Sequence, residues 1–326
     1  MSFLNRYKRF FAENQIMIVL LGIILGLIFP DVFRLLAPYS TYMLMLIFFT
    51  SSLRLETKEI IGYAKDWKML GMANGFMLIF LPLVMWLPLV MFAPDWAMAF
   101  LILGAMPTGM TIALIADLFG GKTSLALVIT ATTSLLAPLT IPLIFWLTIG
   151  QIVPVPILSL FLNLVITIVI PFIIATFIKQ KTPAKIIRYD FWWREISIVT
   201  FGILIAAIVA EATGGGAITI TIRDLSLIII MLIYMGALTT LAYFMSWWRT
   251  HSERATIALC IVYLNNSLSL YIANKFFPDP HLITQLVILL LAINILLPPF
   301  RWIAAHAALL DKQQAIKLKK FSMRKM

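Results

Sequence analysis

Long apolar runs separated by short polar segments dominate the sequence. A helix needs roughly 20 predominantly apolar residues to cross a bilayer. Runs of this kind predict ten transmembrane helices, at about residues 14–30, 36–53, 68–92, 97–119, 123–149, 157–178, 196–215, 225–248, 254–276 and 282–304. The loops between them are short, so residues 1–326 are expected to form a single membrane domain with a basic tail at 305–326. The pattern predicts an all-α polytopic membrane protein.

The composition excludes a soluble enzyme. Hydrophobic residues make up 62% of the chain and charged residues 12%, against about 45–50% and 25% in an average soluble domain. The single cysteine, Cys260, cannot form a disulfide within the chain. Three histidines lie far apart in the sequence, without the spacing of metal ligands. We therefore expect neither a bound metal nor an organic cofactor.

The distribution of basic residues predicts how the protein lies in the membrane. The formal net charge is +11, which in a soluble protein would suggest nucleic acid as a partner. Here the basic residues border the apolar runs. If both termini are cytoplasmic, all 25 Lys and Arg residues except Arg34, Arg223 and Lys275 fall on the cytoplasmic side. This bias follows the positive-inside rule and predicts a multi-pass inner-membrane protein whose partner is the bilayer.

Two of the predicted spans contain polar, helix-weakening patches at matching places. The fourth span contains Pro107 and Gly109, and the ninth contains the adjacent Asn265 and Asn266. Proline removes a backbone donor, and glycine lowers helix stability. The segment 115–119 also resembles 272–276, which predicts two inverted five-helix repeats at about 14–149 and 157–304. Transporters built from inverted repeats bind their substrates where such interrupted helices meet.

These patches predict a substrate site where the two interruptions cross. Amides in hydrocarbon need hydrogen-bond partners, and each interrupted helix can supply them for the other. The positive ends of the broken helices favour an anion. The candidate substrate-binding residues are Thr108, Gly109, Thr111, Asn265, Asn266, Ser267 and Asn294. Two plainer interpretations stay open: the Pro-Gly pair forms a packing kink, and the asparagines join neighbouring helices.

At these residues the sequence resembles the bile acid:sodium symporter family. The stretches Met106–Gly109 and Ser134–Leu139 are similar to its Pro-Gly-Gly break and Leu-Leu-Ala-Pro-Leu run, and Asn265–Ser267 is similar to its Gln-Asn-Ser. The resemblance implies a panel of helices 1, 2, 6 and 7 beside a core of helices 3–5 and 8–10, with helices 4 and 9 crossing. It also implies sodium-driven uptake of small organic anions.

Most positions that the resemblance assigns to sodium lack a suitable side chain. Asn265 replaces the family's glutamine, and Thr130 keeps a hydroxyl. Asn74 lies one turn before another such position and is a candidate replacement. The remaining sodium-ligand positions carry no side-chain oxygen and are Met77, Ile112, Ala113, Ala126 and Ile261. Coupling to two sodium ions is therefore doubtful, although Na⁺ and H⁺ both remain candidate coupling ions.

Other functions remain open. Asp117 is a candidate proton carrier within the spans, although Lys122 could pair with it. An uncoupled carrier and a non-transporting membrane sensor are further alternatives. Related arsenite efflux carriers have a cysteine on helix 4 and a glutamate on helix 9. Met106 and Ile261 stand at roughly those positions, so arsenite efflux is disfavoured.

Overall fold

The computed structural model describes ten separate stretches of the chain, and nearly all of the described residues are helical. They are residues 15–54, 63, 65–109, 112, 115–116, 121–150, 155–214, 222–277, 279–295 and 306. Thr111, Asp117 and the basic tail apart from His306 lie outside the described residues, so the predictions for them stay untested.

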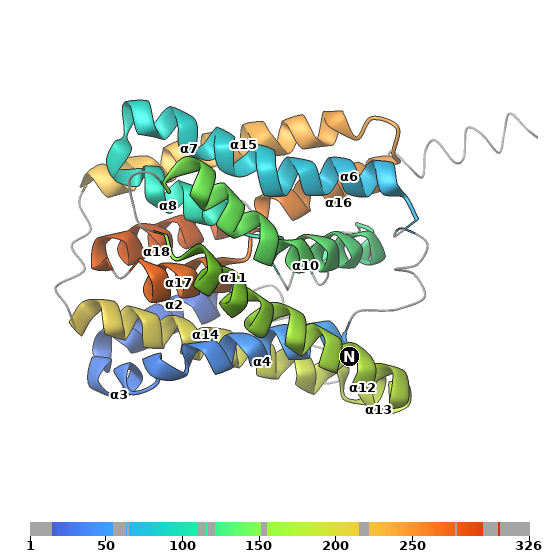
Figure 1. Cartoon of the computed structure of the whole chain (residues 1–326), viewed down its shortest axis with the longest axis horizontal. Coiled ribbons are helices and arrows are strands. Elements are labelled where there is room, and N and C mark those ends of the chain that lie inside the picture. The colour runs from blue at the N-terminus through green and yellow to red at the C-terminus, as the bar shows by residue number, and fades with distance from the viewer. Residues whose placement is uncertain are drawn as a thin grey trace, which may run out of the picture.

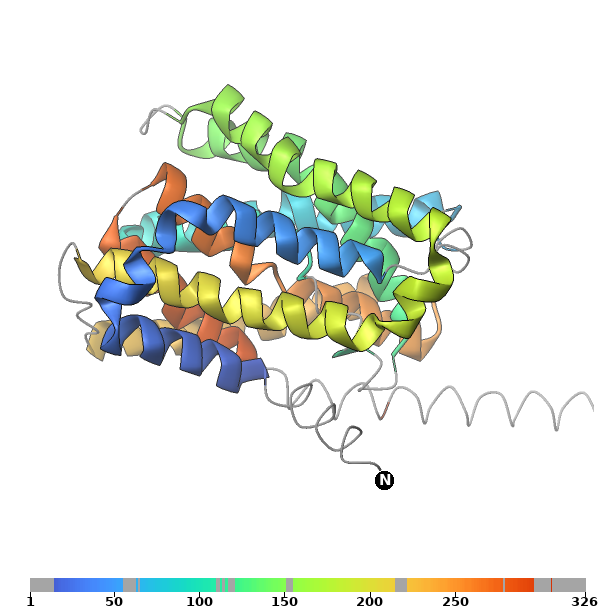
Figure 2. The same ribbon diagram turned by 90° about the horizontal axis from the view of Figure 1, so that it is seen from below.

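Helices that are far apart in the sequence pack into a first group along one side of the molecule. In this group α14 packs between α2 and α4, and α4 also packs on α12. Figure 2 shows these four helices side by side. The first group consists of α2 (Gln15–Ile28), α3 (Pro30–Arg34), α4 (Ser40–Leu53), α11 (Ile157–Leu164), α12 (Ile170–Lys181), α13 (Pro183–Arg188) and α14 (Asp190–Gly214).

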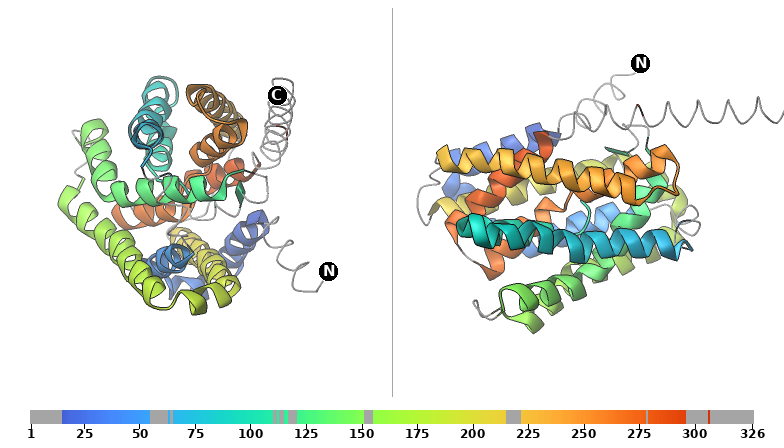
Figure 3. Two further views of the ribbon diagram at one scale, coloured as in Figure 1. Left: turned by 90° about the vertical axis from the view of Figure 1, so that its right-hand side faces the viewer. Right: turned by 90° about the horizontal axis from the view of Figure 1, so that it is seen from above.

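The remaining helices form a second group, and the view down the long axis in Figure 3 shows it beside the first. Its main contacts join α7 with α8, α15 with α16 and α18, and α10 with α16. Figure 1 shows that most helices run roughly along the long axis. The second group consists of α6 (Trp67–Gly75), α7 (Leu81–Phe92), α8 (Pro94–Gly104), α10 (Thr123–Thr148), α15 (Ile222–Met245), α16 (His251–Val262), α17 (Asn266–Phe276) and α18 (Pro280–Ile295).

Six helical segments of the described chain are long and apolar enough to cross a membrane. This confirms a multi-pass, all-helical membrane protein, and the ten-span count and the inverted repeat stay predictions. Shorter apolar helices lie in other predicted spans, at Met17–Ile28, Pro94–Gly104 and Pro280–Asn294. The six segments are Pro30–Leu53, Trp67–Phe92, Thr123–Thr148, Ile157–Lys181, Asp190–Thr213 and Ile228–Met245.

Two of these segments contain a π-helical turn next to a proline. The turn η2 (Phe76–Phe80) joins α6 to α7, and η3 (Val165–Val169) joins α11 to α12. Pro82 and Pro171 stand at the start of the following helices and lack a backbone N–H. A wider turn before each proline keeps the segment helical where the ordinary hydrogen bond cannot form.

Small residues bring α2 and α14 into close contact. A Cβ atom added to Gly22 would lie 2.7 Å from the carbonyl oxygen of Gly202, and one added to Gly26 would lie 2.6 Å from that of Ala206. A Gly-xxx-Gly spacing of this kind lets helix backbones approach closely in membranes. The seam fixes two helices that form one wall of the site described next.

Candidate functional site

The two predicted interruptions exist and lie against each other. α8 ends at Gly104, and the chain between α16 and α17 is non-helical at 263–265. Thr108 and Leu264 form an antiparallel β-bridge. The Gly109 N–H donates to the Tyr263 carbonyl oxygen at 2.7 Å, and the Asn265 N–H donates to that of Pro107 at 2.8 Å. Each stretch thereby satisfies backbone groups that the other leaves free, as a water-free environment requires.

The short bridge explains the glycine at 109. A Cβ atom at this position would lie 2.7 and 2.8 Å from two ring carbons of Tyr263 and 3.1 Å from the Leu264 carbonyl oxygen. The two ring distances are shorter than real Cβ contacts, so a side chain at this position would displace the Tyr263 ring or push the two stretches apart. Glycine allows the close approach that the two backbone hydrogen bonds need.

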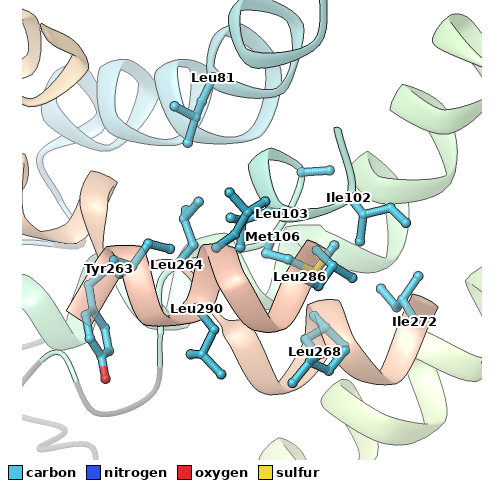
Figure 4. Close-up of a cluster of buried hydrophobic side chains, with 14 of the residues drawn as sticks. Leu81, Ile102, Leu103, Met106, Tyr263, Leu264, Leu268, Ile272, Leu286 and Leu290 are labelled. Carbon is cyan, nitrogen blue, oxygen red and sulfur yellow. The ribbon is translucent and has the colours of Figure 1, made fainter. Parts of the chain in front are cut away.

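Buried apolar side chains hold the interruptions in place. Figure 4 shows Met106 and Leu264 among side chains from the neighbouring helices α7, α8, α17 and α18. Met106, Leu264, Leu268 and Ile272 are all fully buried. Close packing on all sides gives these non-helical segments one defined conformation.

A cavity lies beside the crossing, between the two helix groups. About 550 Å³ of space lies between its lining atoms, and this value includes solvent at the open mouth. The first group contributes mostly apolar side chains: Ile18, Val19, Ile47, Ser197, Ile198 and Phe201. The crossing and α18 contribute Gly109, Tyr263, Leu264, Asn265, Asn266, Ser267, Leu290 and Asn294.

Three asparagines that line the cavity carry buried polar atoms without a hydrogen-bond partner: Asn265 Nδ2, Asn266 Oδ1 and Asn294 Oδ1. The Asn265 Oδ1 caps α17 by accepting from the Leu268 N–H at 3.1 Å, which fixes its Nδ2 as the free group. The Asn294 Nδ2 donates to the Leu290 carbonyl oxygen at 2.7 Å, which fixes its Oδ1 as the free group. The residues that line the cavity therefore hold at least one fixed donor and one fixed acceptor that are buried without a partner, which costs free energy.

Helix ends of both signs meet at the cavity, because α16 ends next to the lining residue Tyr263 and α17 starts there. α17 begins at Asn266, on the cavity wall, so the positive end of its dipole lies at the cavity. No Lys, Arg, Asp or Glu stands among the described residues that line the cavity. The donors that this lining offers to a ligand are the start of α17 and the Asn265 amide.

Five of the predicted substrate-binding residues meet at this cavity: Gly109, Asn265, Asn266, Ser267 and Asn294. Thr108 does not line it. Its side chain is fully buried on the opposite side of the bridge, with Oγ1 3.3 Å from Met77 Sδ and 3.4 Å from the Cys260 carbonyl oxygen. Thr111 lies outside the described residues.

The predicted ion-binding residues are more dispersed. The Thr130 hydroxyl donates to the carbonyl oxygen of Ala126 in its own helix at 2.8 Å. The Asn74 Nδ2 donates to Thr132 Oγ1 at 3.1 Å and to the Leu70 carbonyl oxygen, while its Oδ1 is buried without a partner. Neither residue lines the cavity, and Asp117 lies outside the described residues.

The positions that the family resemblance assigns to sodium are filled by apolar side chains. Met77, Ile112, Ala126 and Ile261 are fully buried. None of these four side chains carries oxygen, the ligand atom that sodium prefers. Ala113 lies outside the described residues.

The apolar wall from α2, α4 and α14 is not predicted by the sequence. Phe201, Ile198 and Ile47 belong to apolar runs in which every face of the helix reads alike. The spacing of Gly22 and Gly26 is the sequence signal that could have indicated the position of this wall, because it is typical of a close helix contact.

Comparisons with known proteins identify the family of this chain. A protein of Bacillus subtilis (strain 168), the uncharacterized sodium-dependent transporter YocS, is 24% identical over 216 residues. The matched region covers 64% of this chain and 66% of that relative, slightly less than two thirds of its length. The model of the sodium bile acid symporter family matches residues 41–221, more than half of the 326 residues. The chain therefore belongs to the sodium bile acid symporter family.

Proposed function

We propose that the protein is a secondary transporter that moves a small organic anion across the cytoplasmic membrane, with both termini in the cytoplasm. The observation that carries this proposal is the cavity at the two helix interruptions, with its unpartnered amide groups. Membership of a symporter family supports transport rather than catalysis.

The groups that line the cavity suggest the chemistry of the substrate. An anionic head, such as a carboxylate, would accept from Asn265 Nδ2 near the start of α17. A hydroxyl or amide on the same molecule would donate to Asn294 Oδ1. Its apolar body would pack against Ile198 and Phe201. The proposed substrate is thus an amphipathic organic anion that carries a hydrogen-bond donor.

The proposed mechanism is alternating access, in which the two helix groups move against each other around the crossing. The cavity lies between the groups, with walls from both. We propose that the first group is the panel and the second group is the core. We also propose that the protein has ten spans in two inverted repeats. This arrangement supports rocking of one group against the other as the step that exposes the site to either side.

We propose that transport does not depend on two bound sodium ions. The buried apolar residues Met77, Ile112 and Ile261 support this, because they leave most of the implied ligand positions without oxygen. The name of the Bacillus subtilis relative favours the alternative of sodium dependence. Proton coupling through Asp117 and uncoupled transport are further alternatives.

Uptake into proteoliposomes tests the function. Ligands are first sought by thermal stabilisation of the purified protein, with taurocholate and a series of hydroxy- and amido-carboxylates as probes. Uptake of the stabilising anions is then followed under a sodium gradient, a proton gradient and neither. We expect saturable uptake above that of protein-free liposomes, and no loss when choline replaces sodium. Binding without uptake would indicate a membrane sensor, and loss of uptake without sodium would show that a sodium site exists.

A further inference from the structure

A network of hydrogen bonds joins the two helix groups at one end of the molecule. Tyr271 on α17 is fully buried, and its hydroxyl donates to Asn163 Oδ1 on α11 at 2.6 Å. The same hydroxyl lies 2.9 Å from Thr41 Oγ1 on α4. The Lys275 ammonium donates to both hydroxyls, at 3.0 Å to Tyr271 and 3.2 Å to Thr41. One tyrosine thus connects α17 of the second group with two helices of the first.

A second contact at the same end joins the groups again. The Asn274 Nδ2 on α17 donates to Glu211 Oε2 near the end of α14 at 2.7 Å. Together these contacts form what we call the end clamp. Its residues are Thr41, Asn163, Glu211, Tyr271, Asn274 and Lys275.

The end clamp is separated from the cavity by buried apolar side chains. α17 begins at Asn266 on the cavity wall, and Tyr271 and Lys275 lie roughly 8 and 14 Å farther along it at about 1.5 Å per residue. One turn inward from Thr41, Leu44 on α4 is fully buried. One turn inward from Glu211, Ile208 on α14 is also fully buried. The cavity is therefore sealed from this end by an apolar layer and then by the clamp.

At the other end of the molecule, the described ion pairs join helices of the same group. Arg54 pairs with Asp190 at 2.8 Å, both in the first group. Arg249 pairs with Asp66 and Glu253, all in the second group. These pairs would stay intact if the two groups separated at that end, whereas the end clamp must break if they separate at the clamped end.

We propose that the end clamp is the gate that holds the outer end of the transport pathway closed, in the state that the structure represents. This inference rests on the proposed function for the direction of transport. Opening this end requires the Tyr271 hydroxyl and the Asn274 amide to give up their partners on the first group. Removing these bonds destabilises the closed state and leaves the packing within each group intact.

Accessibility of a buried cysteine tests the gate without any substrate. Leu44→Cys places a thiol in the apolar layer, directly inside the clamp. The native Cys260 on α16 is fully buried inside the second group and reports general loosening. Right-side-out membrane vesicles are treated with a membrane-impermeant thiol reagent, and the modification of each cysteine is timed by peptide mass spectrometry. The rate at Leu44→Cys is proportional to the population with this end open.

We expect Tyr271→Phe to raise the modification rate at Leu44→Cys about tenfold, and Asn274→Ala to raise it about threefold, with Cys260 unchanged. The matched control is Tyr39→Phe, which removes an exposed tyrosine hydroxyl at the same end and should leave both rates unchanged. An unchanged rate at Leu44→Cys in both clamp variants would overturn the proposal. So would an equal rise at Cys260, because it would show that the variants loosen the whole protein. The assay involves no transported solute, so its failure is separate from a failure of the uptake experiment.

Discussion

The seam between α2 and α14 makes a prediction about stability that can be worked out from distances. In Gly26→Ala the new Cβ would lie 2.6 Å from the Ala206 carbonyl oxygen and 3.1 Å from the Val209 Cβ. Backbone atoms of a packed helix cannot turn aside, so the two helices would have to separate by roughly half an ångström. Overpacking of this kind costs about 1–3 kcal/mol.

The helix propensity of alanine partly offsets this cost, and a control isolates it. Gly236 lies inside α15, and a Cβ added there would meet no atom within 4 Å beyond its chain neighbours and the backbone of its own helix. Gly236→Ala should gain up to about 1 kcal/mol from helix propensity without any clash. Both variants share the propensity term, so the difference between them is the overpacking cost of about 1–3 kcal/mol.

The assay is reversible denaturant unfolding of the purified protein in one detergent, followed by tryptophan fluorescence and supported by melting temperatures. We expect Gly236→Ala to be at least as stable as the wild type and Gly26→Ala to be the least stable of the three. A Gly22→Ala, Gly26→Ala double variant should lose more than Gly26→Ala alone. The close-contact reasoning is refuted if Gly26→Ala is as stable as Gly236→Ala.

Three further predictions concern the crossing, the ions and a helix start. Gly109→Ala should impair ligand binding and uptake at least tenfold, because the new Cβ would collide with the Tyr263 ring; unchanged uptake would contradict the bridge geometry. Replacing potassium or choline by sodium at fixed ionic strength should leave the melting temperature unchanged. A bound ion at about 100 times its dissociation constant would add roughly 2.7 kcal/mol, so a sodium-specific rise would reveal an ion site. Thr250→Ala should lower the free energy of unfolding by about 1 kcal/mol, because Thr250 and Glu253 form the capping box of α16. An unfolding midpoint equal to the wild type would show that this cap contributes nothing.

The crossing is the part of the site that the sequence predicts best. A helix break in a bilayer frees backbone groups that water cannot satisfy, so two breaks at matching places are expected to meet. The backbone bonds between Gly109 and Tyr263 and between Asn265 and Pro107 confirm that they do. The polar residues Asn265, Asn266 and Asn294 also line the cavity together, as three amides within apolar spans suggest.

Thr108 shows why the sequence does not resolve the faces of the crossing. The segment around it is extended, and successive side chains in an extended segment point to opposite sides. Gly109 lies on the cavity, so Thr108 faces Met77 instead. Nothing in the local pattern of polar residues shows which of the two neighbours lies on which side.

Long-range partners are also beyond the sequence pattern. Asn163 and Tyr271 are separated by more than a hundred positions, so nothing local indicates that they bond. The sequence pattern also does not mark where every helix begins in the structure. α14 begins at Asp190 rather than near residue 196, because a helix continues into the polar boundary of the membrane, where apolar character no longer marks it.

Ligand binding to Asn265 variants tests the central claim, that the crossing binds the anionic head of the substrate. Asp and Ser both cap helices as well as Asn does, so Asn265→Asp and Asn265→Ser should keep α17 intact. Asn265→Asp replaces the free amide donor with a negatively charged acceptor, whereas Asn265→Ser keeps a small neutral donor.

The measurement is the dissociation constant of the tightest-binding organic anion found by thermal stabilisation, for the wild type and for each variant. We expect binding at least about 100-fold weaker in Asn265→Asp and roughly tenfold weaker in Asn265→Ser, with both variants folded. Wild-type affinity in folded Asn265→Asp would contradict this expectation.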